Sequence, residues 1–403
     1  MRIAYVLSRF PHLSETFIVR EFDALAGRED IDVELFSLFP AAAGPVQPVA
    51  QPWVSRLRRA NARTALTGLL FWTARRPLTL GRVLIVVAAA HRRRPGRAAR
   101  ALVTVVLAAG HARTMRTLGV NHVHAHYATY PTLTAWVVRR LAGIPYTFTA
   151  HAHDIYVDQS LLEVKVKEAE AVVTISDFNR GFLWPYGAGR ARRVEVVRYG
   201  IDVGRFAYQE RTLPADGPVR LLCVASLQEY KGHRYLIEAL AQSPTLERVS
   251  VDLVGGGHLD GELRRLAAEL GVGDRVRFHG ALPEPRVLEL LNASDGFVLP
   301  SIVAGDGQME GLPNVLIEAL AVGVPVVSTR ISGIPELIRD GDTGLLAEAA
   351  DAGSLARALE RLLADPGDAR RRSRAGRQLV ERDYELRRAA DQMARLLGEL
   401  ALA

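Results

Sequence analysis

The sequence predicts an α/β protein with two doubly wound, Rossmann-like domains, each a parallel sheet with helices on both faces. Short aliphatic and β-branched runs alternate with amphipathic helical segments along the chain, which favours parallel strands joined by helices. The alternation occurs in two series, separated by a polar stretch with Pro and Gly at 208–218. The length of 403 residues is enough for more than one domain.

The expected elements follow this alternation in order. In the first series, strands are predicted at residues 3–7, 33–39, 122–127, 146–149, 172–175 and 194–199. In the second series, they are predicted at residues 219–225, 249–254, 276–279, 296–299 and 324–328. Amphipathic helices are predicted at residues 15–26, 234–241, 259–270 and 286–292, and a helical tail at 356–400 with a break near Pro366. We therefore expect the first domain to cover residues 1–207 and the second to cover 208–383.

Small and polar residues follow most of these strands. Ligands of open α/β sheets bind beyond the carboxyl ends of the strands, so these residues are the first candidates for a site. They include His126, Gly200, Ser226, Gly255 and Gly256. Turns after strands are commonly polar, so the set as a whole, and not any single member, indicates function.

Residues 310–318, with the sequence EGLPNVLIE, carry the strongest signal in the chain. Pro313 suits the first turn of a helix, and Gly311 allows the turn that enters it. The free amides around 311–314 would then form an anion site that suits a diphosphate. Glu318 lies among apolar helix residues, where a carboxylate needs a partner such as the two hydroxyls of a ribose. An ordinary surface glutamate is the alternative.

Three further motifs follow strands. The segment SLQEYKGH precedes a helix, so its Lys231 can reach a phosphate near the helix start, although most lysines are simply solvated. The turn at 254–257 resembles a dinucleotide-binding loop without its full glycine spacing. In the segment TAHAHD, His151 and Asp154 could belong to a metal site, an acid–base group or a hydrogen-bonded loop. A metal is disfavoured, because one such cluster supplies an incomplete set of ligands.

The net charge of +7 is unevenly distributed. Residues 35–153 contain no Asp or Glu, yet they carry many arginines. The segments 53–74, 78–91 and 98–118 mix these arginines with apolar residues, as helices that lie on an anionic membrane do. Arg-rich helices packed on the first domain are the alternative. Arginine is abundant and lysine is nearly absent, a bias that genome composition explains, so the pI says little about nucleic acid and we expect no nucleic-acid partner.

The single cysteine, Cys223, lies in an apolar run and excludes an internal disulfide, which fits a reducing compartment. The chain opens with a strand-like run, so we expect no signal peptide. No uninterrupted apolar stretch approaches the ~18–20 residues that span a bilayer. We therefore expect a cytoplasmic protein.

The order of these motifs resembles the large GT-B family of retaining glycosyltransferases known as family 4. The opening SRFPHLSETFI at 8–18 and the stretch DGQMEGLP at 306–313 are similar to its bacterial exopolysaccharide branch, of the colanic-acid and amylovoran type. The Glu-x7-Glu motif, with AVGVP at 321–325 after it, is highly specific to the family. The resemblance covers nearly the whole chain. It implies two Rossmann-like domains that face a central cleft, with the last helix, about 384–403, crossing back to the N-terminal domain.

The resemblance also implies roles for individual residues. His151 and Glu310 would be catalytic, close to the transferred sugar. The donor would be bound by Ser226, Lys231, Gly255, Gly256, Gly311, Leu312, Asn314 and Glu318. The acceptor side of the cleft would comprise Ser14, Glu15, Thr16, Asp154 and Gly200. No metal and no cofactor are implied beyond the nucleotide-diphosphate sugar itself.

Two positions depart from the family pattern. The family usually has an arginine where this chain has Ser226, so one diphosphate contact is missing or comes from elsewhere. The first strand–helix turn often contains two glycines, whereas this chain has the segment LSET at 13–16. The approach of that loop to the ligand is therefore open.

We expect the protein to transfer a sugar to a lipid-linked glycan in exopolysaccharide biosynthesis, with retention of configuration and without a metal. We expect its Arg-rich half to lie on the inner face of an anionic membrane. A soluble small-molecule acceptor is the second hypothesis. A non-catalytic protein that binds nucleotides or nucleic acid is the third. The presence of Lys231, Glu310, Glu318 and His151 together argues against the third.

Overall fold

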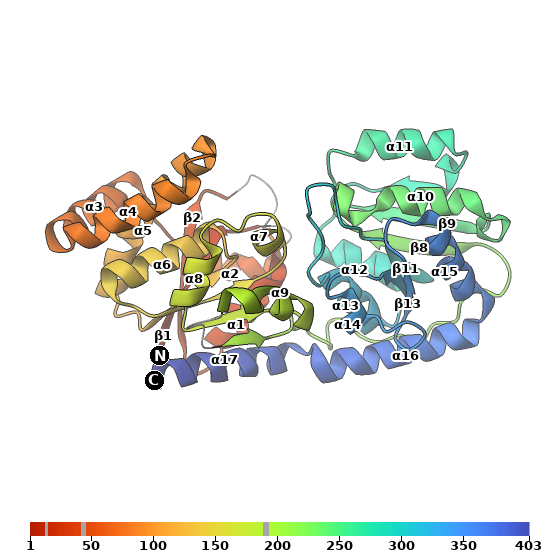
Figure 1. Ribbon diagram of the computed structural model, residues 1–403. Helices are drawn as coiled ribbons and strands as arrows, with labels where there is room; N and C mark the ends of the chain where they lie inside the picture. The colour runs from red at the N-terminus through yellow and green to blue at the C-terminus, as the bar shows by residue number, and fades with distance from the viewer. Residues whose placement is uncertain (13–14, 42–45, 188–192, 403) are drawn as a thin grey trace. The chain divides into compact units, whose positions relative to one another are not determined.

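The chain forms two compact units (Figure 1). The computed structural model describes residues 1–12, 15–41, 46–187 and 193–402. The first unit comprises Met1–Arg198 and Arg387–Ala403, and the second comprises Tyr199–Leu386. The division after Arg198 lies before the expected one after residue 207, and the last helix belongs to the first unit. Among the helices of the described residues, none is both long enough and apolar enough to cross a bilayer.

The first unit is built around a parallel sheet with the strand order β3-β2-β1-β4-β5-β6-β7. The strands are β1 (Arg2–Arg9), β2 (Asp32–Phe39), β3 (Arg58–Arg59), β4 (His122–His126), β5 (Tyr146–Ala150), β6 (Ala171–Thr174) and β7 (Val194–Val196). The order reverses between β1 and β4, and doubly wound sheets bind their ligands at such a switch point. β3 was not predicted, because two successive arginines show no hydrophobic alternation.

Helices cover both faces of this sheet. They are α1 (Thr16–Ala26), η1 (Pro48–Ala50), α2 (Gln51–Val54), α3 (Ala62–Arg75), α4 (Pro77–His91), α5 (Pro95–Thr117), α6 (Tyr130–Ala142), α7 (His153–Tyr156), α8 (Leu162–Glu168), α9 (Asp177–Gly187) and α17 (Leu386–Leu402). Alternate residues of β1 point to opposite faces. Ile3 and Tyr5 join a core with α1, α2 and α17, whereas Ala4 and Val6 join a core with α3, α4, α5 and α6.

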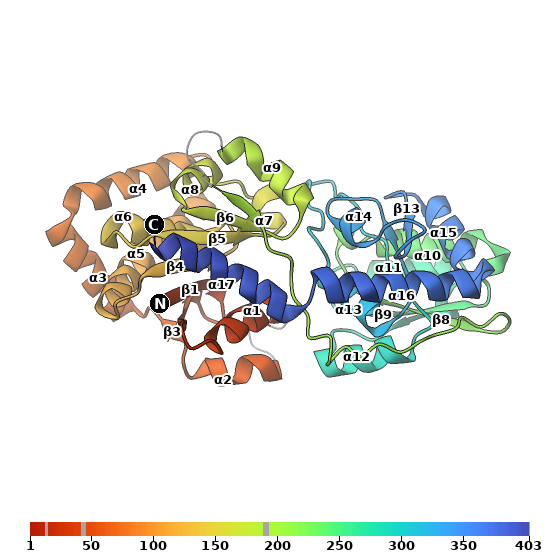
Figure 2. The same ribbon diagram turned by 90° about the horizontal axis from the view of Figure 1, so that it is seen from below.

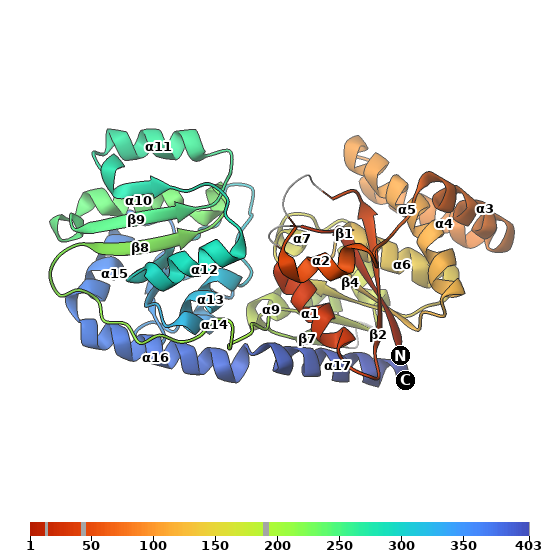
Figure 3. The same cartoon turned by 180° about the vertical axis from the view of Figure 1, so that it is seen from behind.

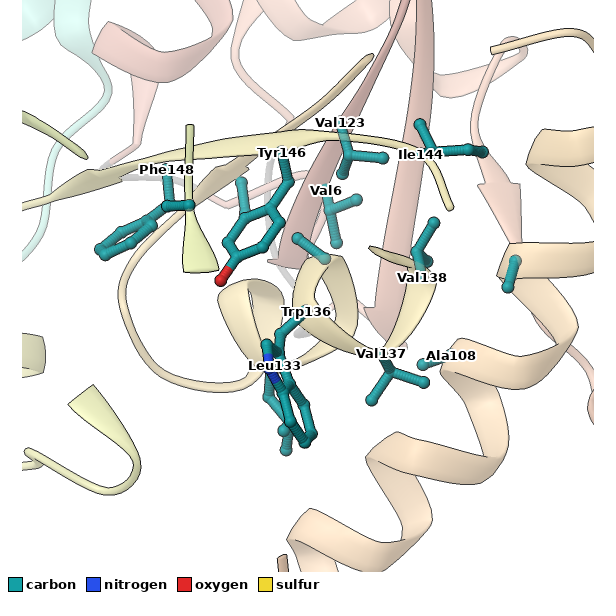
Figure 4. Packing of buried hydrophobic residues seen from close by; sticks show 14 of the residues in the cluster. Val6, Ala108, Val123, Leu133, Trp136, Val137, Val138, Ile144, Tyr146 and Phe148 are labelled. Carbon is teal, nitrogen blue, oxygen red and sulfur yellow. The ribbon is translucent and has the colours of Figure 1, made fainter. Parts of the chain in front are cut away.

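Two packing details show how these cores are completed. In the second core, Tyr146 reaches from its strand toward α6, and the ring of Trp136 lies on the far side of that helix, beside Leu133 (Figure 4). In the first core, Met393 and Leu397 of α17 are fully buried. Figure 2 shows α17 beside α1, on the same side of the sheet. The last helix is therefore part of the first unit's hydrophobic core.

The second unit has its own parallel sheet, with the order β10-β9-β8-β11-β12-β13 and a switch point between β8 and β11. The strands are β8 (Val219–Val224), β9 (Val249–Val254), β10 (Val276–Phe278), β11 (Gly296–Leu299), β12 (Val326–Thr329) and β13 (Leu345–Ala347). Helices lie on both faces (Figure 3). They are η2 (Glu229–Lys231), α10 (His233–Gln242), η3 (Pro244–Leu246), α11 (Asp260–Glu269), η4 (Gly273–Arg275), α12 (Glu284–Ala293), α13 (Asn314–Val322), α14 (Ile334–Leu337), α15 (Ala352–Ala364) and α16 (Pro366–Asp383).

The Arg-rich segment 53–74 is not one helix, contrary to the prediction. α2 ends at Val54, β3 pairs with β2, and α3 begins only after Asn61. Asn61 accepts a hydrogen bond from the Thr64 amide, and the Thr64 hydroxyl accepts one from the Asn61 amide, both at 2.9 Å. This capping box explains where α3 starts. The other two Arg-rich segments correspond to α4 and α5.

Helices α3 and α5 cross closely because glycines face each other at the crossing. A Cβ atom on Gly68 would lie 2.5 Å from the Cα atom of Gly110. Trp72 of α3 completes the contact, since its Nε1 donates a hydrogen bond to the carbonyl of Ala109 at 3.0 Å and its side chain is buried. A larger residue at position 68 would force the two helices apart.

We expect Gly68→Ala to destabilise the protein, because overpacking of a closely packed contact costs about 1–3 kcal/mol. Gly81→Ala in α4 is the matched control, since a Cβ atom there meets nothing within 4 Å. It should stabilise the protein by about 0.5–1 kcal/mol through helix propensity. Denaturant unfolding measures both changes. If both substitutions changed the free energy of unfolding equally, the close crossing of α3 and α5 would be contradicted.

Candidate functional site

In the second unit, the loops after β8 and β11 meet at the switch point because position 232 is glycine. Gly232 has a φ of +69°, and a Cβ atom there would lie 1.9 Å from the carbonyl oxygen of Pro300. Only glycine tolerates both the left-handed backbone conformation and the close approach of this carbonyl. The amide of Ile302 also donates to the carbonyl of Tyr230 at 2.8 Å. Residues of η2 are thereby held against the loop between β11 and α13.

Lys231 and Glu310 form an ion pair across this contact, between Nζ and Oε1. Their side chains are only 14% and 10% exposed. Burial lowers the pKa of Lys231, but Glu310 and Tyr230 outweigh that effect, so the pKa lies above its usual value. Lys231 is therefore a permanent cation at neutral pH. The residue predicted to hold a diphosphate and the residue predicted to act on the sugar thus lie in direct contact.

The first turn of α13 follows Glu310 and contains an unsatisfied acceptor. Gly311 and Leu312 are buried, and the carbonyl of Gly311 accepts a hydrogen bond from the Ser332 hydroxyl at 3.0 Å. Oδ1 of Asn314 is buried and has no hydrogen-bond partner in the part of the chain that the structure describes. An unpaired buried acceptor costs about 1–3 kcal/mol, so a ligand that donates to it would gain affinity.

Glu318 lies further along α13 and is also buried. Its helix neighbours Ile317 and Ala319 belong to the apolar core. A carboxylate in these surroundings requires hydrogen-bond donors. The structure places Glu318 on α13, the helix whose first turn was predicted to bind an anion.

The glycine turn after β9 lies against the loop after β8. Gly255 has a φ of +150°, and a Cβ atom there would lie 1.9 Å from the carbonyl oxygen of Ala225. The amide of Leu227 donates to the carbonyl of Gly256 at 3.0 Å. The turn is therefore adjacent to Ser226, so the structure brings these three predicted donor residues together.

A cavity of about 330 Å³ opens beside η2 and is lined by the first turn of α10 and by the start of α11. His233 lines this cavity, is buried, and has no partner for either ring nitrogen among the described residues. Burial, followed by the charge of Lys231, lowers the pKa of His233 to about 4. The ring is thus neutral. Polar groups of Glu229, His258 and Glu262 complete a lining that suits a small polar ligand.

His151 lies in the first unit, directly after β5, and is buried. The rings of Phe17 and Tyr127 pack on it, with centroids at 5.5 and 4.4 Å. Nε2 of His151 lies 3.3 Å from Nδ1 of His126. Burial lowers the pKa of His151 to about 3, with Asp154 acting in the opposite direction. The imidazole is therefore neutral at physiological pH.

Asp154 holds the loop that carries His151. Its carboxylate accepts hydrogen bonds from the amides of Ala128 at 2.7 Å, Ala152 at 2.8 Å and His151 at 3.1 Å. Asn179 adds a hydrogen bond from Nδ2 to the carbonyl of His151. The Asp154 carboxylate is buried under the loop, and its contacts fix the position of the histidine.

The loop after β4 is strained. Tyr127 has a φ of +74°, a conformation that costs a residue other than glycine about 1–3 kcal/mol. The hydroxyl of Thr132 holds its carbonyl at 2.6 Å. The buried Lys165 donates to the carbonyls of Ala128 at 2.6 Å and Ser160 at 2.7 Å, and burial lowers the pKa of this lysine to about 8. Strain that the surroundings enforce in this way is typical of functional loops.

The remaining residues predicted for the acceptor side are Ser14, Glu15, Thr16 and Gly200. Glu15 precedes α1 and accepts a hydrogen bond from the hydroxyl of Tyr127 at 3.3 Å. Burial raises the pKa of Glu15, while His12 and Tyr127 lower it. Thr16 begins α1, whereas Ser14 lies outside the described residues. Gly200 belongs to the second unit.

Glu21, His124 and His126 form the one group, within the described parts of the chain, whose geometry could hold a metal ion; their ligand atoms lie within 4.8 Å of one another. Each ring nitrogen of His124 and His126 already has a hydrogen-bond partner. Two threonine hydroxyls lie 2.8 and 3.0 Å from His124, and Glu21 and His151 lie 3.2 and 3.3 Å from His126. The group is thus a complete hydrogen-bond network.

Sequence reasoning missed Glu21 and the strained Tyr127. A single glutamate in an amphipathic helix carries no distinguishing sequence signal. The backbone strain at Tyr127 has no sequence signal either. The alternation HVHAH in β4 was an available signal, because alternate strand residues share one face of a sheet.

The chain is related to known glycosyltransferases. A family model described as "Glycosyl transferases group 1" matches residues 205–379. The chain is 38% identical over 214 residues to the amylovoran biosynthesis glycosyltransferase AmsK of Erwinia amylovora, with 52% of each chain covered, so it spans about half the length of that relative. It is 31% identical over 281 residues to a GDP-mannose-dependent alpha-(1-6)-phosphatidylinositol monomannoside mannosyltransferase of Mycolicibacterium smegmatis, covering 65% of this chain and 72% of the relative.

A solved structure shares the fold over the full length. The chain is similar to Anabaena Alr3699/HepE in complex with UDP, with a TM-score of 0.72 and 19% sequence identity. The match covers 99% of this chain and 100% of the other. The two-domain, parallel-sheet architecture is therefore the one predicted from the sequence.

The buried histidines of the first unit predict a loss of stability in acid. Burial lowers the pKa of His111 and His122 to about 4 and that of His126 and His151 to about 3. The unfolded chain binds protons at these sites below about pH 6.5, where the folded chain does not. The free energy of unfolding should therefore fall as the pH drops from about 6.5 to 4, by about 1.4 kcal/mol per pH unit for each histidine.

Denaturant unfolding at pH 7, 6 and 5 measures this slope. In His111→Gln, which leaves the candidate site untouched, the slope should be shallower by the contribution of one histidine. A wild-type free energy that stays constant over this range would contradict the neutral, buried state of these rings.

Proposed function

Because the chain belongs to the glycosyl transferases group 1 family, we propose that it transfers a sugar from a nucleotide-diphosphate donor to a hydroxyl of a lipid-linked glycan in exopolysaccharide biosynthesis. The observation that carries this proposal is the junction of Lys231, Glu310 and the first turn of α13 at the switch point of the second sheet. The name of the Erwinia relative, an amylovoran biosynthesis glycosyltransferase, supports the pathway class.

The donor would bind entirely through the second unit. Its diphosphate would lie between Lys231 and the amides of the first turn of α13, where a helix N-terminus favours an anion. Its nucleoside would lie toward the 330 Å³ cavity beside η2, with the ribose hydroxyls on Glu318. The solved neighbour that binds UDP supports a nucleotide in this fold.

The ion pair of Lys231 and Glu310 has a chemical use in this reaction. As the bond to the sugar breaks, negative charge develops on the diphosphate and positive charge on the sugar. Lys231 stabilises the former and Glu310 the latter, each from a position that is fixed before the reaction. A lysine and helix amides neutralise the leaving group, so we propose transfer without a metal. The resemblance to retaining enzymes suggests that the anomeric configuration of the sugar is retained. NMR of the product measures this configuration.

The acceptor would bind to the first unit near His151, in the cytoplasm. The mycobacterial relative acts on a phosphatidylinositol mannoside, as its name states, which supports a lipid-borne acceptor. A soluble small-molecule acceptor is the alternative, and turnover that is independent of membranes would favour it.

We expect Lys231→Ala to weaken the binding of UDP or GDP roughly 10- to 100-fold, because a hydrogen bond to a charged group contributes about 1.5–3 kcal/mol. Glu310→Gln should bind the same nucleotide as well as the wild type or better, since it frees the lysine, but it should lose turnover. Calorimetry measures the affinities, in excess chelator so that no metal contributes. Unchanged affinity of Lys231→Ala, or lost affinity of Glu310→Gln, would overturn these roles.

The Arg-rich helices of the first unit expose apolar side chains. Leu78 and Ile85 of α4 are 77% and 69% exposed, and Leu66 and Leu70 of α3 are also mostly exposed. Side chains spaced by four or seven residues share one face of a helix. Each helix therefore presents an apolar strip, and Figure 1 shows α3, α4 and α5 side by side at one edge of the first unit.

Exposed arginines lie on α3, α4 and α5 and on the turns between them. They are Arg63, Arg75, Arg76, Arg82, Arg92, Arg93, Arg94, Arg100, Arg113 and Arg116. Residues 35–153 contain no carboxylate, and an acidic partner from elsewhere in the chain, Asp158, lies 3.3 Å from Arg97. We propose that this surface of α3, α4 and α5 docks on an anionic bilayer, to which each engaged arginine contributes on the order of 1 kcal/mol.

Co-sedimentation with phosphatidylserine and phosphatidylcholine vesicles tests the docking surface. Binding should require the anionic lipid and weaken as salt rises, because salt screens the arginines. The triple change of Arg92, Arg93 and Arg94 to Ser should weaken it, and so should Ile85→Gln. Leu270→Gln, at an exposed leucine of the second unit, should not. Absence of binding to anionic vesicles at low salt would favour the soluble acceptor.

A further inference from the structure

The turn from α4 into α5 carries a dense cluster of arginines. Its members are Arg92, Arg93, Arg94, Arg97 and Arg100, and all but Arg97 are exposed. Within the described parts of the chain, Arg97 is the member with an acidic partner, since its Nη1 lies 3.3 Å from Oδ1 of Asp158. Burial raises the pKa of Asp158, but the hydroxyl of Ser160 and the charge of Arg97 outweigh that effect, so the carboxylate is ionised. Five arginines outnumber one carboxylate, and the cluster keeps a large positive charge.

The cluster lies at the edge of the first sheet that also carries His151. The guanidinium of Arg100 lies over the ring of Tyr130, with Cζ 5.9 Å from the ring centroid, and Tyr130 begins α6 directly after the loop that follows β4. Arg97 reaches Asp158, in the segment that follows β5 and α7. The carboxyl ends of parallel strands share one edge of a sheet. The two arginines therefore contact the loops of the edge at which the acceptor was proposed to bind.

An apolar strip leads along α4 to this cluster. Leu78 and Ile85 are mostly exposed, and Arg92 follows the last residue of α4 with a helical backbone conformation, φ −51° and ψ −31°. Positions 78, 85 and 92 are spaced by seven residues, so they share one face of the helix. An amphiphile with its apolar chain beside Leu78 and Ile85 would place a negative headgroup beside Arg92.

We propose that the turn between α4 and α5 is a headgroup site for a lipid-linked acceptor: its arginines bind the phosphoryl group that joins the lipid to the glycan. The lipid chain would lie along α4, and the glycan would extend toward the edge that carries His151. Arginine suits this role, because its planar guanidinium donates two parallel hydrogen bonds to phosphate oxygens. The inference rests on the proposed function, in which the acceptor is borne by a lipid.

Flotation of the full chain with two kinds of phosphatidylcholine vesicle tests this site. One kind contains a long-chain polyprenyl diphosphate, and the other contains phosphatidylserine in the amount that gives the same surface potential. Excess UDP and GDP keep the headgroup from the proposed donor site, and physiological salt weakens the general attraction to anionic lipid. We expect binding to the diphosphate vesicles to be about 10-fold tighter, because bidentate hydrogen bonds add to that attraction.

Two double variants separate the headgroup site from the general attraction. Arg92→Gln with Arg100→Gln should abolish the preference for the diphosphate vesicles. Arg82→Gln with Arg116→Gln is the matched control, because it removes the same charge from exposed positions of α4 and of the other end of α5. This control should weaken binding to both kinds of vesicle and keep their ratio. Equal binding of the wild type to both kinds of vesicle, or a ratio that both double variants change alike, overturns the proposal.

The vesicle measurement involves no turnover, so its failure is distinct from a failure of the proposed function. Absence of sugar transfer from every nucleotide sugar would refute the proposed function and leave the preference for diphosphate vesicles standing. Sugar transfer by a wild type that shows no such preference would refute the headgroup site and leave the proposed transfer standing.

Discussion

The close approach of Gly232 to Pro300 is the constraint on which the candidate donor site depends. No side chain fits between position 232 and that carbonyl, so the loops after β8 and β11 meet where the strand order of the second sheet reverses. This contact places Lys231 against Glu310, directly before the first turn of α13. Separation of the loops would leave a buried charge without its partner, at a cost of about 3–5 kcal/mol.

The two units differ in their buried ionisable groups: the second unit contains a buried ion pair, whereas the first contains neutral buried histidines. The second unit keeps a permanent cation and a carboxylate in contact, so it can respond to charge that develops on a ligand without first moving. The first unit keeps its histidines neutral by burial and connects them through hydrogen bonds to Glu21 and to threonine hydroxyls. In such a network the location of a proton, and not a net charge, is the adjustable property.

The basic character of the first unit also has a structural cause. The arginines of α3, α4 and α5 stand on helices whose inner faces fill a continuous core and whose crossing is tightened by Gly68 and Gly110. The outer faces of α3 and α4 carry both arginines and exposed leucine or isoleucine. Neither property alone distinguishes a solvated helix from an interfacial one, and their combination is the basis of the docking proposal.

Local pattern by itself determined a large part of this protein. Alternating apolar periods indicated two parallel sheets, Pro313 marked the entry to α13, and the motifs singled out Lys231 and Glu310. The start of α3 and the two-residue β3 escaped prediction, because capping and edge pairing depend on a few residues only. Strand order was decided by the tertiary structure alone. It sets β1 beside β4, which brings Glu21 to His126, and β8 beside β11, which brings Lys231 to Glu310. These residues are far apart along the chain, and their meeting depends on sheet register and long-range packing, which no local period encodes.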